Sequence, residues 1–495
     1  MSEDDTAKLL SDELVEICKS DSLSEEGLRD IIERYGVTSN NSLHDESNFN
    51  YDFFIDACGN VNVTEAMIRY LIEYFPNAPR VVSVYGDADM EFWGETPLHL
   101  ACMNSSTSLQ IIQLLIEAAP DCDRYEGSDG NLPIHDLCHN YIKKAEIEML
   151  MVLFDKYPES IRYTDAYGTL PLHNAACERS TEFCRRLVEL YPESERIGSG
   201  DGSLPLHHAC LKNTLPAVEY FYNLYPDAIN HVTTFGHYPI HHALQENVGR
   251  SNDAASVDIV KFLLQLPGVR HQKFGGKSLL HFACMQSQHY NDLTIEAVIQ
   301  KLKIIFDDNP SSIMDVANIR YRHKKVRAFI KGEMVYARQA RDHRQMMRPD
   351  ENGQLPLHRA LRNNVMLGSI KLLLKGNRSA ARSADNNGSF PLHLACQHHD
   401  SPLVIKHLID FCPTTLRHVD FDQDNVLHYA CRGVKYETIA MLLDRYNAGL
   451  VSMRNANNEL PIDLLFKSNS VEDGESEEYT DCVFRLLRAY PETLV

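Results

Sequence analysis

The sequence lacks the long apolar runs that would cross a membrane or direct a chain into the secretory pathway. No stretch approaches the roughly 18 consecutive apolar residues of a membrane span, and the first ten residues, MSEDDTAKLL, are acidic rather than hydrophobic. The 13 cysteines include no CxxC pair, which is typical of free thiols in a reducing compartment. We therefore expect an intracellular protein of the cytoplasm or the nucleus.

The sequence also lacks the short motifs of common enzymes and cofactor-binding proteins. It contains no phosphate-binding loop, no GxGxxG, no HExxH and no nucleophile elbow. We therefore expect no catalytic residues, no cofactor and no metal site. The net charge of −21 argues against general nucleic-acid binding and favours basic partners.

One hydrophobic block recurs through most of the chain. It reads TPLHLAC at Thr96, LPLHHAC at Leu204 and FPLHLAC at Phe390, and seven further copies vary this pattern. The histidines of the block are His99, His135, His173, His207, His241, His281, His358, His393 and His428. Consecutive histidines lie 34 to 40 residues apart except for one interval of 77, and Asp463 takes the next position in the series. A period of this size predicts a repeat architecture.

A second block follows each first block, and most copies end in proline, as in IIQLLIEAAP (111–120) and VIKHLIDFCP (404–413). Its apolar residues recur at i, i+3 and i+4, which predicts one buried face of a helix, and the proline marks the helix end. A polar stretch with a glycine then predicts a tight turn. Each repeat is therefore predicted to consist of a turn, a short helix with proline in its first turn, a second helix and a return loop.

This order of elements and the period near 34 residues resemble the ankyrin repeat. The resemblance extends over about residues 50–495. It implies an all-α, right-handed solenoid of about eleven helix pairs with short inter-repeat turns. It also implies a scaffold or adaptor that binds proteins through turn tips and a concave face. The sequence departs from the family at the motif threonine, which is kept only as Thr96, and in a YPES-like phrase that ends the second helices.

We expect four segments along the chain. They are an acidic helical N-terminal cap (1–49), ankyrin-like repeats (50–317), a basic insertion (318–349) and further repeats with a C-terminal cap (350–495). The insertion accounts for the one long interval between motif histidines.

The insertion is predicted to form a β-hairpin followed by a short helix. KKVRAFIKGEMVYAR (324–338) alternates polar and apolar residues around Lys331-Gly332, as a hairpin does, and ARQARDHRQMM follows it. A loop with so few apolar residues is expected to project from the turns and to be more mobile than the stack.

The insertion differs in charge from the rest of the chain. Residues 318–348 hold ten basic residues against two acidic ones, leaving 38 basic against 67 acidic residues elsewhere. The basic residues are Arg320, Arg322, Lys324, Lys325, Arg327, Lys331, Arg338, Arg341, Arg344 and Arg348. This density predicts an alternative function, electrostatic binding to nucleic acid or an anionic surface. The compact RHKKVR is also typical of a localisation signal.

The repeated histidines and cysteines are interpreted as structural. The motif histidines lie one repeat apart, too far for shared metal coordination, so we expect hydrogen bonds at helix starts. Eight cysteines share one position of the repeat, where a small buried residue suits contact between helices. They are Cys58, Cys102, Cys138, Cys177, Cys210, Cys284, Cys396 and Cys431.

The residue just before each turn glycine is the candidate binding position, because the repeat leaves it free to vary. Along the chain this position holds Trp93, Asp129, Tyr167, Asp201, Phe235, Gly275, Asn352, Asn387, Asp422 and Asn457. The first five alternate aromatic and acidic, and Phe92 adjoins the only tryptophan. Exposed aromatics dominate many interfaces, so we predict a basic amphipathic segment as the ligand. It comes from another protein or from the chain's own insertion acting as a plug. The alternative is that each ring only packs on the neighbouring turn.

Overall fold

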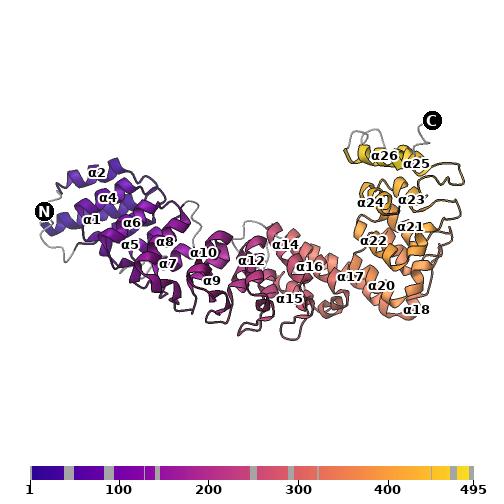
Figure 1. Ribbon diagram of the computed structural model, residues 1–495, viewed down its shortest axis with the longest axis horizontal. Coiled ribbons are helices and arrows are strands. Elements are labelled where there is room, and N and C mark those ends of the chain that lie inside the picture. The colour runs from indigo at the N-terminus through magenta and orange to yellow at the C-terminus, as the bar shows by residue number, and fades with distance from the viewer. Residues whose placement is uncertain are drawn as a thin grey trace. The chain divides into compact units, whose positions relative to one another are not determined.

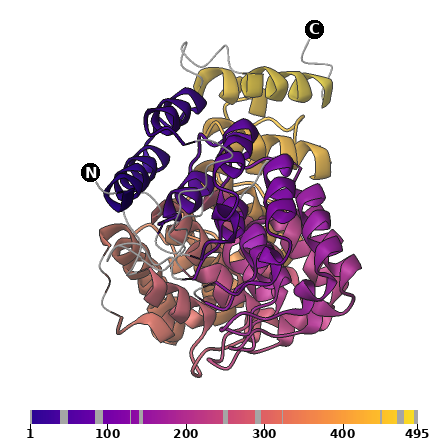
Figure 2. The same ribbon diagram turned by 90° about the vertical axis from the view of Figure 1, so that its left-hand side faces the viewer.

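The computed structural model describes residues 3–37, 49–82, 94–127, 129–139, 145–245, 253–287, 295–319, 321, 323–446, 449–468 and 477–489. Every element in these ranges is a helix, as Figure 1 and Figure 2 show, and the predicted all-α class is confirmed. None of the described helices is long and apolar enough to cross a membrane.

The helices come in consecutive pairs. The first helices are α1 (Glu3–Lys19), α3 (Asp52–Gly59), α5 (Pro97–Met103), α7 (Pro133–His139), α9 (Pro171–Glu178), α11 (Pro205–Lys212), α13 (Pro239–Leu244), α15 (Leu279–Gln286), α19 (Pro356–Arg362), α21 (Pro391–His398), α23 (Val426–Arg432) and α25 (Pro461–Ser468). The second helices are α2 (Glu25–Arg34), α4 (Glu65–Tyr74), α6 (Leu109–Ala118), α8 (Glu146–Lys156), α10 (Thr181–Leu190), α12 (Leu215–Leu224), α14 (Asp253–Gln265), α16 (Ile295–Asp308), α20 (Leu367–Gly376), α22 (Pro402–Phe411), α24 (Tyr436–Tyr446) and α26 (Glu477–Ala489). The pairs from α3–α4 to α25–α26 match the eleven expected from the repeat within the described residues.

Short 3-10 helices follow most of the second helices and begin the return loops. They are η1 (Ala78–Arg80), η2 (Cys122–Arg124), η3 (Pro158–Arg162), η4 (Ser194–Arg196), η5 (Pro226–Asn230), η6 (Val269–His271), η7 (Pro310–Val316), η8 (Arg378–Arg382) and η9 (Pro413–Arg417). The proline that ends several second blocks in the sequence therefore starts a 3-10 turn.

The chain forms two compact units, Met1–Val269 (unit 1) and Arg270–Val495 (unit 2). In unit 1 each first helix packs against the next one from α1 to α13, and in unit 2 the same stacking runs from α19 to α25. Figure 1 shows these helices in chain order within each unit. The stacking places equivalent residues of successive repeats side by side.

The core lies between the two layers of helices and includes the cysteines. All 13 cysteines are buried free thiols, as expected for the eight that share one repeat position. Burial raises the pKa of the Cys177 thiol to about 12, so this thiol stays protonated and unreactive at neutral pH.

The YPES-like phrase has a structural explanation in unit 1. A tyrosine caps the C-terminus of a second helix, and the arginine that ends the preceding 3-10 helix lies over its ring. The pairs and their distances to the ring centroid are Arg124 over Tyr157 (5.0 Å), Arg162 over Tyr191 (5.0 Å) and Arg196 over Tyr225 (5.1 Å). These cation–π contacts join neighbouring repeats.

The basic insertion is a helix, and the predicted hairpin is wrong. α17 (Lys324–Arg341) runs through Gly332 without a turn, and α18 (His343–Met346) follows it. Its apolar residues Val326, Ile330, Met334 and Ala337 are buried. They are spaced three or four residues apart, which places them on one face of the helix.

The predicted projection of the insertion from the stack is also wrong. α17 packs along α20 and against η7, and Met346 of α18 is 1% exposed within the core of unit 2. Asn377 Nδ2 donates to the carbonyl oxygen of Met346 at 3.2 Å. The apolar face of this segment is therefore part of the repeat core rather than a free loop.

Candidate interaction surfaces

The motif histidines start the first helices, as expected. In the first unit His173 Nδ1 accepts a hydrogen bond from the backbone N–H of Leu170 at 3.0 Å, and in the second His393 Nδ1 accepts one from Phe390 at 3.1 Å. Asp463 replaces the histidine and accepts from the N–H of Leu460 at 2.7 Å. Because the donor is a backbone group, the histidine keeps this role in repeats that lack the motif threonine.

Several of these rings also join neighbouring repeats. The Nε2 of His173 lies 2.9 Å from the carbonyl oxygen of Ile197, and that of His393 lies 3.1 Å from the oxygen of His418. Because Nδ1 accepts, Nε2 carries the proton and donates. Burial lowers the pKa of His173 to about 4, so the ring is neutral at pH 7. The exception is His281, whose Nδ1 contacts the oxygen of Asp315 while Ser278 caps the helix.

The turn tips are joined by a row of backbone hydrogen bonds. In unit 1 the carbonyl oxygens of the tip residues accept from an N–H of the next turn: Asp129 from Ala166, Tyr167 from Gly200 and Asp201 from Thr234, each at 2.8 Å. In unit 2 the same bond joins Asn352 to Asn386, Asn387 to Phe421 and Asp422 to Ala456, at 3.0, 3.1 and 2.7 Å. Neighbouring turns are therefore held together through their backbones, whatever side chain each tip carries.

The tip side chains of unit 1 differ in their exposure to solvent and in the contacts they make. Tyr167 is 65% exposed and Phe235 is 70% exposed. The hydroxyl of Tyr167 reaches Asp129 Oδ1 at 3.4 Å, so this ring leans on the neighbouring turn and still faces solvent. Phe92 and Trp93 lie outside the described residues.

The carboxylate of Asp201 forms hydrogen bonds within its own turn. It accepts from the hydroxyl groups of Ser199 and Ser203 at 2.7 and 3.0 Å. Burial opposes ionisation of Asp201, but these hydrogen bonds outweigh it and lower the pKa. Asp201 therefore shapes its turn more than it reaches outward.

Unit 2 presents an aromatic residue that the sequence analysis missed. Phe421 is 75% exposed. It lies one residue before the tip position held by Asp422, so a comparison of one position per turn passed over it. The tips on either side carry Asn387 and Asn457, as expected for a polar row.

The insertion presents a basic face to solvent. Lys324, Arg327, Lys331 and Arg338 are exposed on α17, and exposed Val335 lies among them. Arg341, Arg344 and Arg348 are also exposed, and Lys325 pairs with Glu296 at 3.5 Å. Arg320 and Arg322 lie outside the described residues. The same helix therefore packs with its apolar side and leaves most of its basic side chains exposed to solvent.

Models of the ankyrin repeat match the chain in two places, a single repeat over residues 93–124 and three copies over residues 357–452. The chain therefore contains ankyrin repeats. Ankyrin repeats generally mediate protein–protein interactions, and ankyrin-repeat proteins are typically non-catalytic. A comparison with curated proteins found no match.

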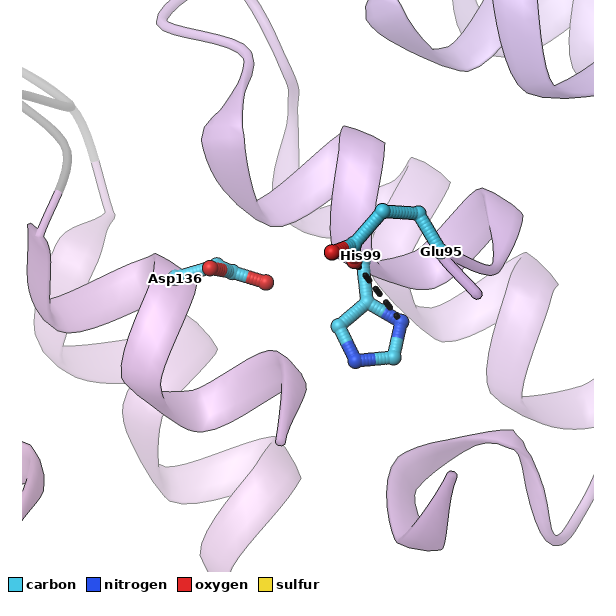
Figure 3. Close-up of side chains that lie close together, drawn as sticks. All are labelled: Glu95, His99 and Asp136. Carbon is cyan, nitrogen blue, oxygen red and sulfur yellow. Dashed lines mark ion pairs between the residues drawn. The ribbon is translucent and has the colours of Figure 1, made fainter. Parts of the chain in front are cut away.

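The chain also holds a group of side chains with metal-ligand chemistry. Among the described residues that group is Glu95, His99 and Asp136, whose ligand atoms lie within 4.8 Å of one another (Figure 3). All three are buried. The sequence pattern predicts no metal site at the histidines, which lie one repeat apart. The two carboxylates occupy variable positions of neighbouring repeats, so no motif indicates their proximity.

Proposed function

We propose that the protein is a non-catalytic scaffold that binds another protein through the turn tips of unit 1. The observation that supports this best is the exposure of Tyr167 and Phe235, at 65% and 70%, on turns held by inter-repeat backbone hydrogen bonds. Aromatic side chains on a fixed backbone supply apolar contact area at a small cost in conformational entropy. Such residues typically contribute most of the energy of an interface.

We propose a basic amphipathic segment of another protein as the ligand. The exposed rings suit its apolar side chains, while Asp129 and the net charge of −21 suit lysine and arginine. The chain's own insertion fits this role poorly, since α17 buries Val326 and Ile330 within unit 2. A plug would have to give up that packing.

Selection of peptides from a display library on the full chain tests the proposal. The selected peptides should combine basic with large apolar residues. Trp93→Ala, Tyr167→Ala and Phe235→Ala should each weaken binding by up to about 2 kcal/mol, measured by calorimetry. Asn387→Ala and Asn457→Ala are the matched changes on unit 2. If these two weaken binding more than the three aromatic changes, the binding face is misplaced.

The basic face of α17 supports a second candidate function, electrostatic binding to nucleic acid or an anionic surface. Exposed Lys324, Lys331 and Arg338 lie on one side of a helix whose other side is anchored in the core. Binding through these groups should weaken steeply with salt. The triple change Lys324→Gln, Lys331→Gln and Arg338→Gln should reduce both affinity and salt dependence, whereas binding unaffected by this change would exclude the face.

A further inference from the structure

Seven histidines lie close together in three consecutive repeats of unit 1. They come from α9, α11, α13 and the return loop before α13, and they form the histidine cluster: His173, His207, His208, His231, His237, His241 and His242. The centroid of each ring lies 5.2 to 5.9 Å from that of another. His208 and His242 directly follow a motif histidine, whereas α19, α21 and α23 carry Arg359, Leu394 and Tyr429 at that position. The repeat motif therefore does not account for these two additional rings.

The rings of the cluster contact one another from one repeat to the next. The ring centroids of His173 and His208 lie 5.2 Å apart, and so do those of His207 and His242. His237 adds a third contact, with its centroid 5.7 Å from that of His242. Histidine rings therefore join α11 to α9 on one side and to α13 on the other. Positive charges on two such rings would repel each other, because a buried site screens charge poorly.

Several ring nitrogens of the cluster lack a hydrogen-bond partner in the described part of the chain. His207 Nδ1 accepts from the N–H of Leu204 at 3.1 Å, so its Nε2 carries the proton. That Nε2, the Nε2 of His208 and both ring nitrogens of His242 are buried without a partner among the described residues. His208 Nδ1 lies 3.5 Å from Cys177 Sγ, which is a weak partner. A protonated ring has two N–H donors, so protonation would add buried donors that lack acceptors.

Little negative charge faces these rings. The carboxylates that favour their protonation are Asp201, which acts on four of the rings, and Asp165, which acts on His173. Burial is the larger influence, and it lowers the pKa of His208 to about 3 and that of His242 to about 4. Charged side chains on the surrounding helices pair with one another in three cases: Glu178 with Lys212, Glu195 with Arg196 and Asp258 with Lys261.

The cluster adjoins the turns that carry two of the tip residues. His231 Nε2 donates to the carbonyl oxygen of Gly202, the residue after Asp201, at 3.0 Å. The N–H of Thr234 donates to the carbonyl oxygen of Asp201 at 2.8 Å, and the tip residue Phe235 follows Thr234 in the sequence. A change in the distance between α11 and α13 would therefore disrupt bonds that fix the spacing of these two tips.

We propose that the histidine cluster is a proton-operated switch for the tips that carry Asp201 and Phe235. At neutral pH the uncharged rings pack together and hold α11 against α13. At acidic pH several rings take up protons together, the two helices separate, and the two tips lose their fixed spacing. The loss of a ligand that follows from this separation rests on the proposed function, whereas the separation itself does not.

Hydrogen exchange of the full chain, followed by mass spectrometry as the pH is lowered from neutral, tests the separation. The measured rates are corrected for the intrinsic effect of pH on exchange. Protection of α11 and α13 should then fall by more than about tenfold per pH unit below about pH 6, since each proton taken up contributes up to about tenfold. The comparison is α19, where Arg359 follows the motif histidine His358. Its protection should fall by about tenfold per pH unit or less.

The double change His208→Asn and His242→Leu tests whether the cluster causes the opening. Equivalent positions of other repeats carry Asn174 and Leu394, so the fold accepts these side chains, which circular dichroism at neutral pH checks. Protection of α11 and α13 should fall less steeply in this variant, by up to about 100-fold per pH unit, because two proton sites are removed. His139 is exposed on α7, and the control His139→Gln should leave the steep pH dependence unchanged.

A peptide selected on the full chain at neutral pH tests the consequence for binding. Calorimetry should show at least about tenfold weaker binding of this peptide at the pH where α11 and α13 have opened, because the binding-competent state is then a minor one. The double variant should retain its affinity at that pH. No binding at neutral pH would contradict the proposed function and leave the switch standing. Equally tight binding to the opened state would contradict the coupling between the switch and the tips.

Two results would overturn the switch itself. Protection of α11 and α13 that falls by no more than about tenfold per pH unit would mean that the rings do not take up protons together. An equally steep fall in the double variant, or in α19 of the unchanged chain, would mean that groups outside the cluster cause the opening.

Discussion

Ser369 of α20 donates its hydroxyl hydrogen to Glu333 of α17 at 2.5 Å, and both side chains are buried. Burial raises the pKa of Glu333, and the hydrogen bond from Ser369 counteracts part of that rise. This contact joins the insertion to a regular repeat helix through a polar pair inside an apolar layer. A helix tied in this way contributes to the stability of unit 2.

Replacing Ile330 by alanine should therefore destabilise unit 2. Ile330 is fully buried on α17, and truncating such a side chain costs about 2–5 kcal/mol. The control is Val335→Ala on the same helix, where the side chain is 51% exposed and the expected change is within about 0.5 kcal/mol. Urea unfolding followed by circular dichroism measures both. Equal midpoints for the two variants would contradict the packing of α17.

Replacing His173 by alanine should destabilise unit 1 by about 1–3 kcal/mol, because it leaves the buried N–H of Leu170 without an acceptor. It also removes the bond to the carbonyl oxygen of Ile197. His281→Ala is the comparison, since Ser278 Oγ accepts from the N–H of His281 and keeps that helix capped. Thermal unfolding should show a smaller loss of stability for His281→Ala than for His173→Ala. A larger loss for His281→Ala would show that accepting the backbone N–H at the helix start is not the main role of these rings.

Acidification should weaken unit 1 through His242. Burial and the neighbouring His237 lower the pKa of His242 to about 4, while Asp201 acts in the opposite direction, and the ring also packs on His207. The pKa of His242 in the folded protein lies below its ordinary value. The contribution of His242 to stability is therefore fully present above about pH 6.5 and is lost as the pH falls toward 4.

The variant His242→Leu isolates this effect. The contribution of His242 to the loss between pH 7 and pH 5 is about 2 kcal/mol. Urea midpoints of His242→Leu should fall less over this range than those of the unchanged chain. Parallel pH profiles would show that the ring titrates normally in the folded protein.

Substitutions at the turn tips should separate the contribution of the side chain to stability from that of the backbone. Tyr167→Ala removes an exposed ring and should alter stability by no more than about 0.5 kcal/mol. Gly168→Ala should cost more than about 1 kcal/mol. Gly168 has a φ of 68°, and its added Cβ would lie 2.8 Å from the backbone nitrogen of Gly200. Differential scanning calorimetry compares the two, and a reversed order would contradict the described turn.

Periodic features of the structure were predictable from the sequence. The spacing of His99, His135 and their equivalents fixed the helix pairs, because each copy of the motif repeats the same local geometry. The insertion occurs once, and its alternation around Lys331-Gly332 suggested a hairpin. The spacing of Val326, Ile330, Met334 and Ala337 is that of one helix face, whereas the hairpin prediction rested on the alternation alone.

Two other features could not be found by comparing repeats. Phe421 is exposed one residue away from the position that was compared along the chain. Glu95 and Asp136 lie 41 residues apart in the sequence and belong to different positions of the repeat. Their contact depends on how two turns stack and on the absence of a side chain at Gly127. Neither the stacking distance nor a single missing side chain leaves a periodic signal.

The backbone bonds between turn tips have a consequence for how this protein changes over evolution. The carbonyl oxygens of Asp129, Tyr167 and Asp201 make the same bond at the same length, although the three side chains differ in charge, size and polarity. Under the proposed function, exposed tips such as Tyr167 are thus sites where we expect substitution to change recognition more than stability, whereas Asp201 also holds its own turn. We therefore expect a lineage to acquire a new ligand by exchanging exposed tip side chains one at a time.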